Sequence, residues 1–84
     1  MPSKYLILQT PEGEKAVIFP EEDFYHDEMA ERLDQLGIIA AGFVQIEENG
    51  KVHCFGRSES LEIEGRGEDD AIVIARQLAI ANRN

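Results

Sequence analysis

The feature of this sequence that most constrains its fold is a plan that occurs twice: two strand-like runs joined by a glycine-containing turn, and then a helix-like run. In the first half, the runs Lys4–Gln9 and Ala16–Phe19 flank a turn at Pro11–Glu14. Proline presets φ in this turn and glycine permits a positive φ. A helical pattern then continues to Leu36.

The second half follows the same plan with different residues. The runs Ile38–Glu47 and Val52–Arg57 flank Asn49 and Gly50, and a helical pattern extends from Glu68 to the end. The repeat is therefore one of layout only. It predicts an α+β fold of order ββαββα, with a four-stranded, mainly antiparallel or mixed sheet and two helices.

The length of 84 residues is enough for one hydrophobic core, so we expect a single α+β domain over residues 1–84. The lone cysteine, Cys54, excludes a disulfide within the chain and is typical of a reducing compartment. No apolar run approaches the roughly 20 residues that span a bilayer, and the first residues lack the pattern of a signal peptide. These observations favour a cytoplasmic protein.

The net charge of −9 is concentrated in residues 1–50, which contain eleven acidic and three basic residues. Such a surface repels phosphate backbones and anionic lipids, so we expect no direct binding of nucleic acid or membrane. The simplest interpretation is a solubilising surface. The alternative is an acidic mimic of DNA that inhibits a nucleic-acid-binding protein, and its carboxylates would be Glu21, Glu22, Asp23, Asp27, Glu28, Glu31 and Asp34.

Each hairpin has a register that the turn chemistry predicts. A four-residue loop in the first hairpin would place Leu8 opposite Val17. A two-residue type I′ turn at Asn49 and Gly50 in the second hairpin would place Val44 opposite Phe55. In both registers, apolar side chains occur on the two faces of the sheet.

The first helix is expected to begin after Asp23 as N-cap and to end at Gly37. Its apolar face recurs at helical spacing and comprises Tyr25, Met29, Ala30, Leu33 and Leu36. The last helix begins with three acids, Glu68, Asp69 and Asp70, in the arrangement that a helix dipole favours. Its apolar stripe is unusually broad and comprises Ala71–Ala75, Leu78, Ala79, Ile80 and Ala81.

A sheet with two apolar faces needs cover on both. Either one helix lies on each face, or both helices lie on one face and a second copy of the chain covers the other. The broad apolar surface of the last helix favours the second arrangement and a symmetric homodimer. The expected contact residues are Val73 and Ile80 of that helix together with Ile39 and Phe43 of the sheet, and Arg66 could pair with an acid of the partner.

The residues that bear reactive groups form no catalytic pattern. A metal site would draw on the two histidines and the cysteine, with one acid: His26, His53, Cys54 and Asp27. His53 and Cys54 are neighbours in a strand and point to opposite faces, so they are not expected to share a metal. Cys54, Ser58 or Ser60 could act as a nucleophile with His53 as base, but the spacing supplies no third group to orient the base. We therefore predict no catalytic residue, no metal and no cofactor.

Two other patterns bear on ligand binding. Gly65, Arg66 and Gly67 precede a helix as in an anion cradle, but the three acids that follow would repel a phosphate. A small enzyme or ligand-binding protein would need a deep pocket that encloses His53, Arg57 or Cys54. The function that the sequence favours is a small, non-catalytic, homodimeric interaction or accessory module.

The segment Cys54–Ile63, followed by Arg66, Glu68 and Asp69, resembles a family of small proteins of unknown function found in bacterial genomes and prophage-like regions. The similarity extends to Tyr5–Leu8 with Pro11 and Gly13, and to Phe19 with Pro20, about half of the chain. Because no activity is attached to that family, the resemblance implies no catalytic or binding residues.

Overall fold

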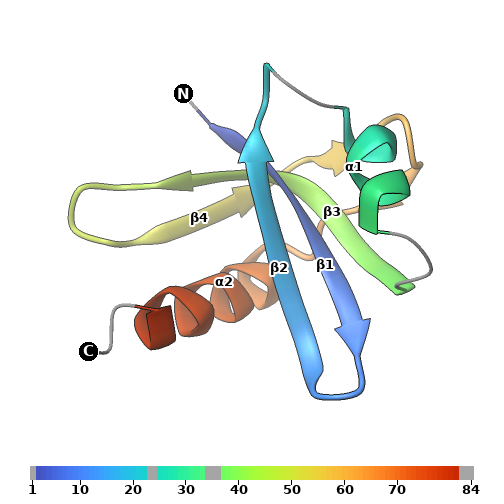
Figure 1. Ribbon diagram of the computed structural model, residues 1–84. Coiled ribbons are helices and arrows are strands. Elements are labelled where there is room, and N and C mark those ends of the chain that lie inside the picture. Colours follow the sequence, from blue (N-terminus) through green and yellow to red (C-terminus); the bar gives the residue numbers. More distant parts are fainter. Residues whose placement is uncertain (1, 23–24, 34–36, 82–84) are drawn as a thin grey trace.

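The chain folds into a four-stranded sheet with two helices, which confirms the predicted α+β class and the ββαββα order (Figure 1). The computed structural model describes residues 2–22, 25–33 and 37–81. A second, small sheet of two short strands is added before the last helix. The elements are β1 (Ser3–Thr10), β2 (Gly13–Pro20), α1 (His26–Leu33), β3 (Gly37–Ile46), β4 (Val52–Phe55), β5 (Arg57–Ser58), β6 (Ile63–Glu64) and α2 (Glu68–Ala81).

The strand order in the main sheet is β2-β1-β3-β4, and each neighbouring pair is antiparallel. β1 is therefore an inner strand, flanked by β2 and β3. Its residues Tyr5–Leu8 are all buried, because both faces of the sheet are covered at this point. This explains why β1 is a continuous apolar run rather than an alternating one.

The β1–β2 hairpin is tighter than the sequence predicts. Thr10 pairs with Gly13, so the loop has two residues, and Leu6 lies opposite Val17. Thr10 Oγ1 donates a hydrogen bond to the Gly13 carbonyl oxygen at 2.7 Å, and Gly13 adopts a φ of 117° that only glycine takes readily. The predicted register is wrong by two residues. Because a shift of two preserves the alternation of side chains, each residue keeps its predicted face.

The β3–β4 hairpin has a longer loop than predicted. The Glu47 N–H donates to the Lys51 carbonyl oxygen at 2.9 Å, so residues 48–50 form a three-residue loop that ends at Gly50, with φ 87°. Val44 consequently pairs with Cys54 instead of Phe55. The predicted register is wrong by one residue, and such a slip turns every β4 side chain to the opposite face.

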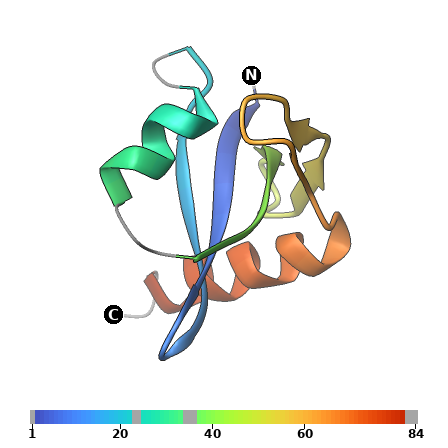
Figure 2. The same ribbon diagram turned by 90° about the vertical axis from the view of Figure 1, so that its right-hand side faces the viewer.

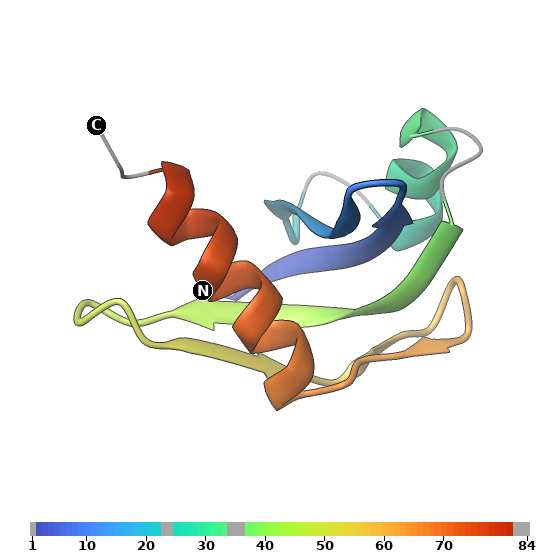
Figure 3. The ribbon, with the colours of Figure 1, turned by 90° about the horizontal axis from the view of Figure 1, so that it is seen from below.

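Each face of the sheet is covered by one helix. Between the sheet and α2 lies a buried cluster, which joins Ile74 of α2 to the sheet residues Tyr5, Ile7, Ala16, Ala40, Val44 and Cys54. The other face contains Leu6, Leu8, Phe19 and Ala41, against which Met29 and Ala30 of α1 pack together with Leu61 and Ile63. Seen from below, α2 crosses the strands of the sheet (Figure 3). The first of the two predicted arrangements is thus observed, and the homodimer prediction loses the support of an uncovered face.

α1 is anchored by a histidine that is not among the residues expected on its buried face. His26 is only 3% exposed, whereas Tyr25, expected on the buried face, is 67% exposed. His26 Nε2 lies 2.9 Å from the Gly42 carbonyl oxygen, and its ring packs edge-on against Phe19 and Phe43. A carbonyl oxygen only accepts, so Nε2 carries the proton.

The start of α1 has a cap of a different kind from the one expected. The Tyr25 N–H donates to Glu28 Oε1 at 2.9 Å, which is the side-chain half of a capping box. The predicted N-cap Asp23 and the predicted apolar residue Leu36 lie outside the described residues.

The segment between β4 and α2, for which the sequence pattern is too weak to predict a structure, forms a small hairpin. β5 pairs with β6, and Leu61 and Ile63 pack on the α1 side of the main sheet. Ser58 is fully buried, and its Oγ accepts the Leu61 N–H at 3.1 Å.

Candidate interaction surface

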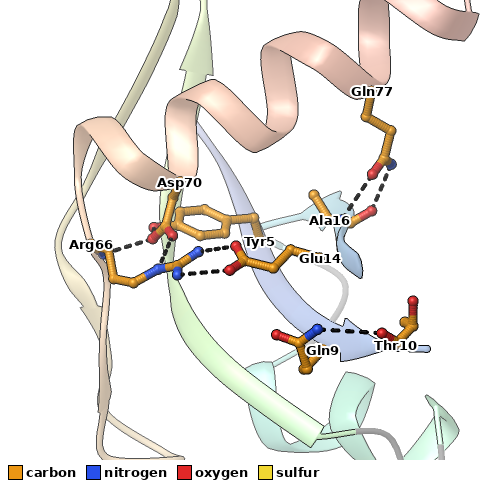
Figure 4. Close-up of polar contacts among 8 residues, drawn as sticks. All are labelled: Tyr5, Gln9, Thr10, Glu14, Ala16, Arg66, Asp70 and Gln77. Atoms are coloured by element: carbon orange, nitrogen blue, oxygen red, sulfur yellow. Dashed lines mark hydrogen bonds and ion pairs between the residues drawn. The ribbon is translucent and has the colours of Figure 1, made fainter. Parts of the chain in front are cut away.

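A buried carboxylate joins the start of α2 to the centre of the sheet. Asp70 is fully buried in the first turn of α2. The Tyr5 hydroxyl donates to Asp70 Oδ2 at 2.5 Å. Arg66 donates its backbone N–H to the same oxygen and its Nε–H to Oδ1, both at 2.6 Å (Figure 4). Hydrogen bonds to a charged group are stronger than neutral ones, so these contacts offset the cost of burying the carboxylate.

The guanidinium of Arg66 extends this network to the β1–β2 hairpin. Its Nη2 lies 2.7 Å from Glu14 Oε1, and its Nη1 lies 3.3 Å from Glu14 Oε2. The hydrogen bond from Arg66 lowers the pKa of Glu14, and the hydrogen bond to Glu14 is the main cause of the raised pKa of Arg66. Residues far apart in the chain are thereby tied together beside the N-terminus of α2.

Tyr5 is held as a neutral donor. Burial, and then the hydrogen bond to Asp70, raise the pKa of Tyr5 above its ordinary value of 10.0. The loop that carries Arg66 passes directly over this hydroxyl: a Cβ on Gly65 would lie 2.8 Å from Tyr5 Oη and 2.8 Å from the Gly56 carbonyl oxygen. Glycine is therefore required at position 65 for close packing.

The exposed edge of β2 is closed at its middle by a side chain of α2. Gln77 Oε1 accepts the Ala16 N–H at 2.9 Å, and Gln77 Nε2 donates to the Ala16 carbonyl oxygen at 2.8 Å (Figure 4). The amide thus occupies the place of a neighbouring strand residue. An edge strand with free N–H and C=O groups is a template for pairing with another chain, so this contact protects β2.

A groove of about 980 Å³ lies between the tip of the β1–β2 hairpin and α2. The hairpin tip reaches past α2, as two perpendicular views show (Figures 1 and 2). We call this surface the α2 groove. It is lined by Glu12, Gly13, Glu14, Lys15, Arg66, Asp69, Ile72, Val73, Arg76, Gln77 and Ile80.

The α2 groove differs in charge from the molecule as a whole. Lys15, Arg66 and Arg76 balance Glu12, Glu14 and Asp69 in its lining, whereas the chain has a net charge of −9. Two of its apolar residues are open to solvent: Ile72 is 44% and Ile80 is 66% exposed. The groove therefore combines apolar and paired-charge character, as protein interfaces do.

Three of the five predicted interface residues meet in this groove. Arg66, Val73 and Ile80 all line it. Ile39 and Phe43 lie elsewhere, on β3. Ile39 is 38% exposed because it is the extra residue of a β-bulge, where Ile7 pairs with Ala40 and Leu8 pairs with Ile38.

Phe43 belongs to an aromatic group on the α1 side of the sheet. Its ring stacks on Phe55 at 5.9 Å between centroids, and Phe55 stacks on His53 at 5.5 Å.

Arg66 was expected to pair with an acid of a partner chain. The acids that it contacts in the structure, Glu14 and Asp70, belong to its own chain.

The structure keeps the candidate nucleophile and base apart. Cys54 is buried on the α2 face, and burial raises the pKa of its thiol to about 11. His53 is exposed and stacks on Phe55, toward the other face. Within the described ranges, no group of three His, Cys, Asp or Glu side chains could hold a metal ion.

The remaining polar candidates are engaged locally. Arg57 forms ion pairs with Glu59 and Glu64 of the β5–β6 hairpin. Ser60 Oγ accepts the Asp27 N–H at the start of α1 at 3.3 Å. None of His53, Cys54 and Arg57 lines the α2 groove, so this groove is not the pocket that a ligand-binding site around them would need.

The acidic residues of the proposed DNA mimic are only partly described, because Asp23 and Asp34 lie outside the described residues. The eight residues of α1 expose Asp27, Glu28 and Glu31. A helix of that length extends about 12 Å. Glu22 is exposed as well and Glu21 is partly buried, and the mimic stays a prediction.

The network residues Asp70, Glu14 and Gln77 were not identified from the sequence. Asp70 has the position of an ordinary helix-start acid. One signal distinguishes it: it precedes the buried Ile74 by four residues, so the helical period places it on the core face.

Comparison with known proteins places the chain in no family: no family model matches it, and neither the curated proteins nor the solved structures contain a match. The resemblance described above therefore stays a prediction. No helix in the described part of the chain is long and apolar enough to cross a membrane.

Proposed function

We propose that this protein is a small, non-catalytic interaction module that forms a homodimer through the α2 groove. The observation that carries the proposal is the exposure of Ile72 and Ile80 on α2, beside a groove that brings together Arg66, Val73 and Ile80. Contiguous apolar surface with a charged rim is typical of protein-binding sites.

Charge supports self-association through this surface rather than another. Two chains of net charge −9 repel each other, and this repulsion is smallest where acids and bases balance. The lining of the α2 groove contains three of each sign. Its approach to a second copy therefore costs less electrostatic energy than the approach of an acidic surface such as that of α1.

The test is sedimentation equilibrium of the full chain across the micromolar range. The wild type should show a reversible dimer, and Ile72→Lys should weaken it. Ile46→Lys is a matched control, since Ile46 is 46% exposed and does not line the groove. A wild-type monomer at every concentration, or equal effects of the two substitutions, would contradict the proposal.

A further inference from the structure

We propose that the two copies pair through antiparallel α2 helices, with Asp69 of each copy facing Arg76 of the other. This arrangement rests on the homodimer proposed above and specifies its geometry. It identifies the occupant of the α2 groove as the α2 helix of a second copy.

The positions of Asp69 and Arg76 on α2 make this pairing feasible. They are seven residues apart, so they lie on one face of the helix, about 10.5 Å from each other along its axis. Both are exposed and both line the α2 groove. Neither forms a side-chain ion pair within the described residues, whereas Arg66 and Glu14 in the same groove do. When a second α2 helix packs antiparallel against this face, the acid of each helix can lie opposite the base of the other.

Electrostatics selects one register among those that join the apolar residues. If Ile72 packed against Ile80 of the second copy, the twofold axis would pass through Arg76 and set two guanidiniums against each other. If Asp69 faces Arg76 instead, the axis passes between Ile72 and Val73. The two Ile72 side chains then meet near the axis, with an ion pair on each side. Opposite charges across an interface fix register in this way.

The same register gives Ile80 a place to pack. Position 80 of one copy falls opposite position 65 of the other, which is the loop that carries Arg66 at the end of the groove. Antiparallel helices also bring the acidic first turn of each α2 beside the basic residue of the other. The contact involves one helix face per copy, so we expect a reversible dimer rather than a permanent one.

The test is a charge reversal with rescue, read by sedimentation equilibrium. D69R and R76E should each weaken the dimer at least about tenfold, because each replaces two attractive contacts by two repulsive ones. The double variant D69R/R76E should restore the wild-type affinity to within about threefold. D69R is the sharper single variant. It lowers the net negative charge, so general repulsion alone predicts a tighter dimer, whereas the cross-pair predicts a weaker one.

The matched control is E62R, which makes the same charge change on the exposed turn between β5 and β6 and should not weaken the dimer. Circular dichroism shows that each variant is folded. A dimer that tightens in R76A would indicate the register with facing arginines and overturn the proposed one. A dimer that is weakened by Ile72→Lys but not by D69R or R76E would retain the proposed function and reject this pairing. A wild-type monomer would reject both.

Discussion

Replacing Asp70 by alanine should destabilise the fold more than any other single removal of a carboxylate from the described chain. Asp70 is fully buried and accepts hydrogen bonds from the Tyr5 hydroxyl, the Arg66 backbone N–H and Arg66 Nε. In the variant, the Tyr5 hydroxyl is left in the core without this acceptor, which costs about 1–3 kcal/mol. Removing one partner of a buried ion pair costs about 3–5 kcal/mol, and we expect the lower end of that range because Arg66 is partly exposed and keeps its ion pair with Glu14.

That loss is large beside the total stability. A chain of 84 residues has a free energy of unfolding of about 4–13 kcal/mol. A loss of about 3 kcal/mol lowers the melting temperature of a domain of this size by at least about 12 °C. Chemical denaturation followed by circular dichroism measures both quantities.

The control for Asp70→Ala is Glu68→Ala, which removes an exposed acid from the same helix turn and should cost less than about 1 kcal/mol. Should Asp70→Ala not fold at all, Asp70→Asn keeps the size of the side chain and gives a measurable intermediate loss. Equal midpoints for Asp70→Ala and Glu68→Ala would refute the inference that the buried network stabilises the fold.

Three further outcomes follow from the described contacts. Gln77→Ala should lower the free energy of unfolding by about 1–3 kcal/mol, because two hydrogen bonds to Ala16 are lost, and the exposed edge of β2 should increase light scattering at high concentration. Gln77→Glu keeps only the acceptor, so both effects should be intermediate. Burial lowers the pKa of His26 below 6.5, so the unfolded chain binds the proton first and the free energy of unfolding should fall as the pH drops below 6.5. His26→Gln keeps a donor for the Gly42 carbonyl oxygen but does not titrate; if its stability depended on pH as steeply as that of the wild type, this assignment would be contradicted. The buried Cys54 thiol, with its pKa raised to about 11, should react with a thiol reagent at neutral pH only when the chain unfolds, and rapid labelling of the native protein would disprove its burial.

Hydrophobic periodicity was enough to predict the element order, but not the details that depend on one residue of loop length. The β3–β4 hairpin has an Asn-Gly pair that normally forms a two-residue turn, yet Gly50 ends a three-residue loop here. That one residue turns Cys54 toward α2 and Phe55 toward the other face. In the β1–β2 hairpin, an error of two residues left every face correct. Whether a register error is odd or even therefore decides which face each side chain occupies, and its size does not.

The buried polar residues were unpredictable for another reason. His26 and Asp70 are polar, so a pattern of apolar positions does not count them among the core residues, although helical spacing sets Asp70 on the same face as the buried Ile74. What buries them is a partner far away in sequence: Gly42 accepts from His26, and Tyr5 donates to Asp70 across 65 positions. The spacing of residues in the sequence does not reveal such pairings, and the apolar pattern therefore predicts a buried Tyr25, which is exposed, and not the buried His26.

The proposed contact surface depends on these same polar pairings. The α2 groove is built from two elements, and its width is set by how the β1–β2 hairpin is held against α2. Arg66 holds them together at one point, because its guanidinium contacts Asp70 at the start of α2 and Glu14 of the hairpin. Gln77 holds them at a second point, two turns further along α2, by binding Ala16. With the hairpin side of the groove fixed at both points, the solvent-facing side of α2, with Asp69, Ile72 and Arg76, is a preformed surface. The proposed dimer would therefore lose less free energy to ordering.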